Sequence, residues 1–191
     1  MIGNDIVDIS EAKQSSNWER PRFLDKLFTP REQQLIKNSD NLFLMVWRLW
    51  SMKESAYKLY TQLNPSRFYN PKQFECEIND SEGEVIYKDF RCYLKTKTTS
   101  QYIMSEARLD VKDMISESIK LDDSSPKNQS EAVKNKLFSR IAEHYIILKK
   151  DLKLIKSEFG IPEVYYNSKK LNISISISHH GNCGAYGILQ V

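Results

Sequence analysis

A polar stretch at residues 120–130 divides this chain. It combines Asp, Ser, Asn and Gln with Pro126 and shows no apolar periodicity, which is typical of a linker. We therefore predict a first subdomain over 1–119 and a second over 131–191. The chain has 191 residues, of which 40% are apolar, so it can bury one substantial core or two small ones.

Composition and charge exclude several classes of protein. No apolar run approaches the roughly 20 residues that cross a bilayer, and six Gly and six Pro are too few for a low-complexity chain. The N-terminal residues lack the basic and long apolar segments of a secretion signal. The formal charge of +3 suits an acidic partner or a phosphorylated ligand, but it is less basic than we expect of a nucleic-acid-binding protein.

Three cysteines fit a reducing compartment. Cys76, Cys92 and Cys183 are an odd number and do not have the spacing of metal ligands. Together with the missing secretion signal, they predict free or buried thiols in a cytoplasmic protein.

Periodicity predicts the elements of the first part. Residues 2–9 alternate as in a strand and place Asp5 on its more apolar face, with Gly3 and Val7. Thr29, Pro30 and Glu32 form a helix-capping signature. The predicted elements are a strand at 2–9, short helices at 21–28 and 30–38, a long helix at 41–62, and strands at 74–79, 85–98 and 101–109.

The second part repeats this order of elements. An apolar face that includes Val133, Leu137 and Ile141 predicts a helix from about 130 to 158, which Gly160 and Pro162 would end. The strands expected after it cover 163–166, 172–179 and 183–190. We therefore predict an α+β fold of two similar subdomains, each with a long helix on a small, mostly antiparallel sheet.

Charged residues interrupt the apolar stripe of the 41–62 helix. Lys53 lies within the stripe, so its ammonium should either reach solvent or meet a fixed anion. Glu54 and Lys58 are neighbours on one helix face. Such a cluster is usually an ion-pair network, and it can also form a binding site.

Asp5 has a similar requirement, because a carboxylate on an apolar strand face needs a cation or hydrogen-bond donors. A Mg²⁺ ion shared by Asp5 and Glu54 would satisfy both, since proteins hold Mg²⁺ through one or two carboxylates beside phosphate oxygens. The alternative is a solvated Asp near the end of a strand.

A serine-rich strand runs into two histidines. Ile and Ser alternate over 173–178, and His179, His180 and Gly181 follow. A Ser-His pair at a strand end is a common surface feature and can also bind a phosphate. The sequence contains no hydrolase elbow, no zinc motif and no Gly-rich phosphate loop.

Three ordered motifs resemble those of the 4′-phosphopantetheinyl transferases. They are Gly-Asn-Asp-Ile-Val-Asp-Ile at 3–9, Leu-Trp-Ser-Met-Lys-Glu-Ser-Ala-Tyr-Lys at 49–58 and Ile-Ser-His-His-Gly at 177–181, and Phe28-Thr-Pro-Arg-Glu32 is similar to a further segment of the family. The motif order is that of the small holo-acyl-carrier-protein synthase type, which forms trimers. The length is that of the larger, two-half type. A monomer with its site between its two halves would explain both, and a trimer is the alternative.

The resemblance implies a site and a reaction. Asp5 and Glu54 would bind Mg²⁺, and Lys58 and Lys53 would contact the phosphates of coenzyme A. Ser178 and His179 would hold its nucleotide or diphosphate portion. Glu54, or a water that it orients, would be the general base. Phosphopantetheine would pass to a serine of an acidic apo carrier protein, acyl or peptidyl, and adenosine 3′,5′-bisphosphate would be released. Asp5, Glu54 and Lys58 are thus the expected catalytic residues.

Two positions depart from the larger type. Val7 stands where that type has a third carboxylate, so we expect water in that coordination position. Ile161 replaces the lysine of a Gly-Lys-Pro loop, and we expect Lys169 or Lys170 to substitute for it.

The resemblance also leaves a docking surface and two other functions to consider. An acidic carrier could dock on the residues Arg20, Arg22, Phe23 and Lys26. The alternatives to the enzyme are a non-catalytic coenzyme A-binding regulator or scaffold and a small nucleic-acid-binding module.

Overall fold

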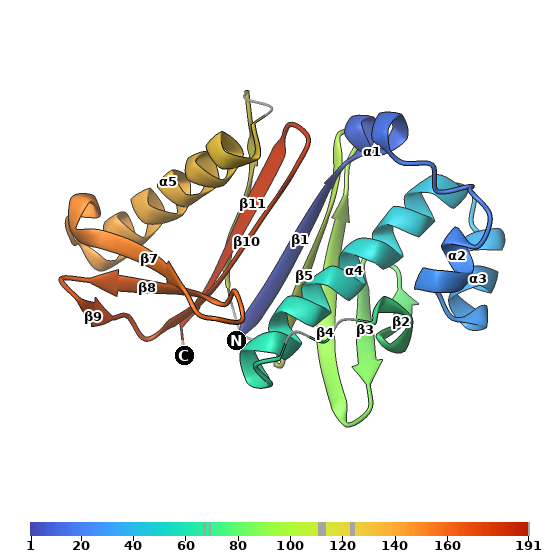
Figure 1. The fold of residues 1–191 in the computed structure, drawn as a ribbon, viewed down its shortest axis with the longest axis horizontal. Coiled ribbons are helices and arrows are strands. Elements are labelled where there is room, and N and C mark those ends of the chain that lie inside the picture. Colours follow the sequence, from blue (N-terminus) through green and yellow to red (C-terminus); the bar gives the residue numbers. More distant parts are fainter. Residues whose placement is uncertain (67, 69, 111–113, 123–124, 191) are drawn as a thin grey trace.

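The computed structural model describes residues 1–66, 68, 70–110, 114–122 and 125–190. The fold is α+β, with two long helices packed on antiparallel sheets (Figure 1). A helix of 22 residues, α4 (Leu42–Leu63), crosses the first sheet. In spatial order the strands of this sheet are β1 (Ile2–Asp8), β5 (Tyr102–Arg108), β4 (Phe90–Thr98), β3 (Glu82–Tyr87) and β2 (Glu75–Asn79).

Short helices cover the start of α4. They are α1 (Ile9–Ser15), α2 (Phe23–Leu27) and α3 (Pro30–Lys37), and the 3₁₀ turn η1 (Pro71–Gln73) lies against the middle of α4, where Lys53 Nζ donates to the Pro71 oxygen. Thr29 and Glu32 form the expected capping box at α3. Helix α1 was not predicted; it begins where the Asp8 carboxylate accepts hydrogen bonds from Ser10 N–H and Glu11 N–H.

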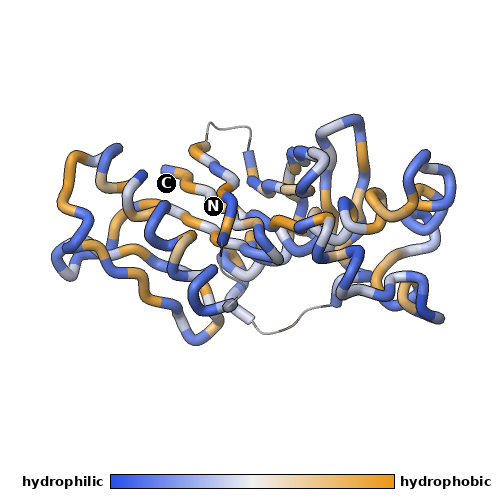
Figure 2. Tube along the Cα trace, turned by 90° about the horizontal axis from the view of Figure 1, so that it is seen from above, coloured by the Kyte–Doolittle hydropathy of each residue, from blue (hydrophilic) through white to orange (hydrophobic). Residues whose placement is uncertain are grey.

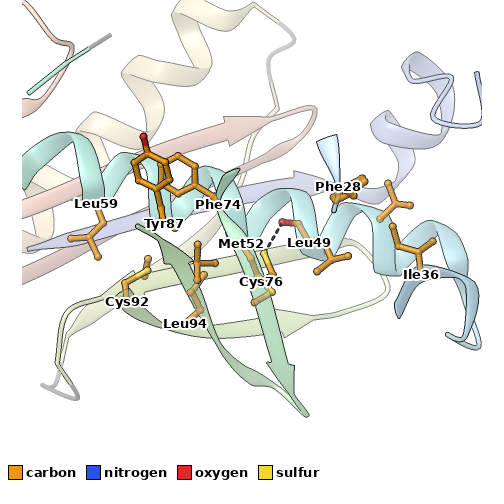
Figure 3. Close-up of a cluster of buried hydrophobic side chains, with 14 of the residues drawn as sticks. Phe28, Ile36, Leu49, Met52, Leu59, Phe74, Cys76, Tyr87, Cys92 and Leu94 are labelled. Carbon is orange, nitrogen blue, oxygen red and sulfur yellow. Dashed lines mark hydrogen bonds between the residues drawn. The ribbon is translucent and has the colours of Figure 1, made fainter. Parts of the chain in front are cut away.

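The core of this half lies between α4 and the sheet. Figure 3 shows Leu49 and Met52 of α4 beside Cys76, whose Sγ contacts the Leu49 carbonyl oxygen. All three cysteines are buried and free, as expected. Buried and exposed residues alternate along β4, which is the pattern of a strand with one buried face. Figure 2 shows hydrophobic and hydrophilic residues interspersed along the chain.

The second half contains two small sheets. Strand β11 (Cys183–Gln190) lies between β10 (Ile173–His180) and β6 (Ile115–Lys120). The helix α5 (Pro126–Tyr145) packs on this sheet and also contacts the third sheet. That sheet consists of β7 (Leu152–Lys156), β8 (Pro162–Tyr166) and β9 (Lys169–Lys170), with η2 (Lys149–Asp151) before it.

Two predicted elements were wrong in extent. The helix expected to reach 158 ends at Tyr145, because Ile146 adopts a left-handed conformation and Leu152–Lys156 form a strand. The strand expected over 85–98 is a hairpin, since the chain reverses at Lys88, where φ is 53°. Strands β6 and β9 were not predicted.

The expected linker and subdomain boundary stay a prediction. Of residues 120–130, positions 123–124 lie outside the described residues, and α5 begins at Pro126. Strand β6 falls in the range assigned to the first subdomain, yet it pairs with β11 in the second sheet. Among the described residues, no helix is both long enough and apolar enough to span a bilayer.

Candidate functional site

The free edge of β1 organises the candidate site. This strand pairs with β5 on one side and faces β10 on the other, between the two halves (Figure 1). Ile2 N–H donates to Ser174 Oγ at 3.0 Å, and Asn4 N–H donates to Ser176 Oγ at 2.9 Å. Further along, Asp8 N–H donates to His180 Nδ1 at 3.0 Å.

Along this edge of β1, side chains of β10 thus accept the hydrogen bonds that the backbone of a neighbouring strand would otherwise accept. Two β1 carbonyl groups are satisfied from α4 in the same way. Gln62 Nε2 donates to the Ile2 oxygen at 2.6 Å, and Lys58 Nζ donates to the Asn4 oxygen at 2.8 Å. The alternation of Ser and Ile over 173–178 therefore supplies hydroxyl groups to the edge of β1.

Asp5 and Lys58 form an ion pair beside this edge. Lys58 Nζ lies 3.0 Å from Asp5 Oδ1, and the two side chains are 31% and 15% exposed. Gly3 permits the contact, because a Cβ at this position would collide with the Ser55 carbonyl oxygen of α4. Burial raises the pKa of the Asp5 carboxyl, while the charge of Lys58 opposes this shift.

Glu54 lies on the same stretch of α4. Ser105 is the register partner of Asp5, and its Oγ and carbonyl oxygen contact the hydroxyl groups of Ser51 and Ser55. The turn of α4 that carries Glu54 is therefore packed against this part of β1 and β5. Glu54 is half-buried, one helical turn before Lys58.

A Mg²⁺ ion held by the carboxylates of Asp5 and Glu54 would have few protein ligands. The described ranges contain no group of three or more His, Cys, Asp or Glu side chains that could hold a metal ion. Asp8 does not join Asp5, because its carboxylate caps α1 and accepts a hydrogen bond from Asn182 N–H at 2.8 Å. Oxygen ligands from two carboxylates, completed by water and phosphate, fit the usual coordination of Mg²⁺.

A pocket of about 310 Å³ opens beside Lys58, between the two halves. Its cationic and imidazole groups come from four elements: Lys58 of α4, Lys134 of α5, Lys156 of β7 and His179 of β10. None of the lining residues is Asp or Glu. Gly160, Ile161 and Pro162 form part of the wall, so the loop with the replaced lysine lies at the pocket. Lys134 also pairs with Glu131 on the same helix, and Lys58 pairs with Asp5. Lys156 adds a further positive charge to the wall, so the charge distribution favours an anionic ligand.

His179 and Ser178 are not brought together. Neighbouring residues of a strand point in opposite directions, and only His179 lines the pocket. Ser178 Oγ is buried and has no hydrogen-bond partner among the described residues. Burial lowers the pKa of His179, and the charges of Lys58 and Lys156 lower it further.

Lys53 lies elsewhere, in the core. Its ammonium is 2.7 Å from Glu32 Oε1, and both side chains are fully buried. It also donates to the Phe74 oxygen at 2.6 Å. Of the two outcomes that the sequence allowed, Lys53 thus meets a fixed anion inside the protein, and it does not join Asp5 and Lys58.

Sequence reasoning missed two of the pocket cations. Lys134 and Lys156 were not singled out, since neither interrupts an apolar pattern in a way that marks it. The expected substitutes do not line the pocket: Lys170 pairs with Glu163 at 2.5 Å, and Lys169 is exposed. The suggested docking surface also changes, because Phe23 is buried against Trp47.

Comparison with known proteins agrees with the motifs at 3–9 and 49–58, while the motif at 177–181 lies outside the matched residues. The family model of the 4′-phosphopantetheinyl transferase superfamily matches residues 1–113, which include Asp5, Glu54 and Lys58. The chain belongs to this superfamily. No curated protein matches it in a sequence search.

Proposed function

We propose that this protein transfers 4′-phosphopantetheine from coenzyme A to a serine of an apo carrier protein, in a reaction that needs Mg²⁺. The observation that carries the proposal is the pocket beside the Asp5–Lys58 pair, which gathers Lys58, Lys134, Lys156 and His179 without an acidic lining residue. Membership of the superfamily supports the transfer chemistry. The diphosphate and the 3′-phosphate of coenzyme A are anions that such a pocket would bind.

Each residue has a proposed role in this reaction. Asp5 and Glu54 would hold Mg²⁺, which neutralises charge on the diphosphate when bound. Lys58 would contact the diphosphate, because its ammonium lies both at Asp5 and in the pocket wall. Lys156 and Lys134 would take the place of the missing loop lysine.

Glu54, directly or through a water, would accept the proton of the carrier serine. The serine oxygen then forms a bond to the phosphorus of the phosphopantetheine group. The bond from that phosphorus to the bridging oxygen breaks, and adenosine 3′,5′-bisphosphate leaves with that oxygen. Positioning and charge stabilisation supply most of the rate enhancement.

One chain contains both walls of the proposed site. The α4 side contributes Lys58, and α5, β7 and β10 contribute the remaining cations. This supports the proposal of a monomer with its site between its halves rather than a trimer. The carrier would dock through acidic residues, and Arg20, Arg22 and Lys26 remain exposed for this contact.

Intact-mass spectrometry tests the proposal. The protein is incubated with coenzyme A, Mg²⁺ and several apo acyl and peptidyl carriers, and each carrier is examined for a phosphopantetheine adduct. No adduct on any carrier would contradict the proposed enzyme. If coenzyme A still binds without transfer, the protein is instead a non-catalytic coenzyme A-binding relative.

A further inference from the structure

Gln129 connects α5 to the end of β10. This residue lies in the first turn of α5, and only 6% of it is exposed. Its Nε2 donates to the Gly181 oxygen at 2.7 Å, and its Oε1 lies 3.1 Å from His179 Nδ1. One buried amide therefore contacts both the turn after β10 and the imidazole of the pocket.

These two contacts determine the hydrogen positions. The Gly181 oxygen can only accept, so the NH₂ group of Gln129 must face it. Oε1 then faces the imidazole, and an amide oxygen also can only accept. His179 Nδ1 must therefore carry a hydrogen, which leaves Nε2 as the ring nitrogen for a ligand.

We propose that Gln129 is a positioning residue: its Oε1 accepts a hydrogen bond from His179 Nδ1–H and so turns Nε2 toward the pocket, where the protonated ring donates from Nε2–H to a phosphate group. The inference rests on the proposed function for the identity of the ligand, coenzyme A. The tautomer of His179 does not depend on the proposed function, because it follows from the hydrogen bonds alone.

The hydrogen bond to Gln129 is also compatible with protonation of the His179 ring. A phosphate oxygen accepts hydrogen bonds, so it requires a hydrogen on Nε2 as well. The bond from Nδ1–H to Gln129 is the same in the neutral and the charged imidazole, so the ring need not turn when Nε2 gains a proton. Burial of His179 and the charges of Lys58 on α4, Lys156 on β7 and the neighbouring His180 disfavour that proton until an anion offsets them, whereas Lys134 on α5 is paired with Glu131.

Imidazole nitrogen NMR on the full chain tests the tautomer without any ligand. The protein contains three histidines, so the His179 signals can be assigned with His144→Gln and His180→Gln. We expect wild-type His179 as the Nδ1–H tautomer and Gln129→Leu as a mixture of both tautomers. Gln129→Glu keeps an acceptor at Nδ1, so it should restore the Nδ1–H form. Asn135→Leu, an exposed change on the same helix, should alter nothing.

Coenzyme A binding by calorimetry gives the second measurement. Gln129→Leu and His179→Asn should each weaken binding about tenfold, and the double variant should be no weaker than His179→Asn, because both act through one contact. A wild type with the Nε2–H tautomer, or an unchanged tautomer in Gln129→Leu, would overturn the inference. The expected tautomers in a protein that binds no coenzyme A would overturn the proposed function and support the placement of His179 by Gln129.

Discussion

The ammonium of Lys53 lies 2.7 Å from Glu32 Oε1, and neither side chain is exposed to solvent. The remaining donors and acceptors of the pair are also used. Lys53 donates to the oxygens of Phe74 and Pro71, and Glu32 accepts from Cys76 N–H and Thr29 N–H. This buried ion pair connects α3, α4 and the start of β2. Each buried charge is tolerated because the opposite charge lies beside it.

Lys53→Met should therefore destabilise the protein by about 3–5 kcal/mol, because it leaves the Glu32 carboxylate buried and unpaired. Denaturant unfolding measures this change. Arg31→Ala is the matched control, since it breaks the exposed Arg31–Glu77 pair and should cost about 0–1 kcal/mol. Normal stability with weaker coenzyme A binding in Lys53→Met would instead support the contact to phosphate that the motif implies.

The serines of β10 should differ in their effect on stability. Ser174→Ala and Ser176→Ala each remove the acceptor of a β1 N–H group, which we expect to cost about 1–3 kcal/mol. Ser178→Ala should change the free energy of unfolding by no more than about 0.5 kcal/mol, because its Oγ has no partner among the described residues. Equal losses in all three variants would contradict the role of these hydroxyl groups at the β1 edge.

Asp5→Asn and Glu54→Gln should each reduce the transfer rate by at least about 10²-fold while the protein stays folded, because each removes a proposed metal ligand. Glu54→Gln also removes the proposed general base. Adduct formation at saturating coenzyme A measures the rate, and circular dichroism checks the fold. Asp89→Asn, at an exposed carboxylate in the turn between β3 and β4, is the control. Full activity without Asp5 or Glu54 would exclude the proposed metal pair.

The stability of the protein should carry a pH-dependent contribution from Asp5. Its pKa is raised above 3.8 in the folded state, so the folded protein binds more protons than the unfolded chain over that window. This contribution is fully present below pH 3.8 and is lost as the pH rises through the raised pKa. Asp5→Asn cannot ionise, so its stability relative to wild type should increase between about pH 4 and pH 7. Unfolding curves at both pH values test the sign, and an opposite trend would mean that Lys58 outweighs the effect of burial.

Lys156→Ala should weaken coenzyme A binding about tenfold or more, because a charge-assisted contact to phosphate is lost. Lys153→Ala is the control, since Lys153 is exposed on the same strand and does not line the pocket. Titration calorimetry at two salt concentrations distinguishes the two variants, because only the contribution of Lys156 to the binding free energy of coenzyme A should decrease with added salt. The same loss in both variants would indicate a diffuse effect of charge and no specific contact.

Local patterns predicted much of the fold. The alternation over 2–9, the capping box at Thr29 and the apolar stripe of α4 each correspond to an observed element. The helix that ends at Tyr145 shows the limit, because the apolar residues after it fit a helix and a strand alike. Their pairing with β8 decides between the two.

The sequence by itself determined that Glu54 and Lys58 share a helix face and that Asp5 lies on the more apolar face of its strand. Helical spacing also separates Lys53 from Lys58 by about 140° around the axis, which agrees with their different surroundings. Only the tertiary structure decided which cations meet. Lys134 and Lys156 resemble other surface lysines in their local sequence, and they reach one pocket because α5 and β7 pack beside α4 and β10. Contacts between segments far apart in the chain, which no local period records, thus complete the site.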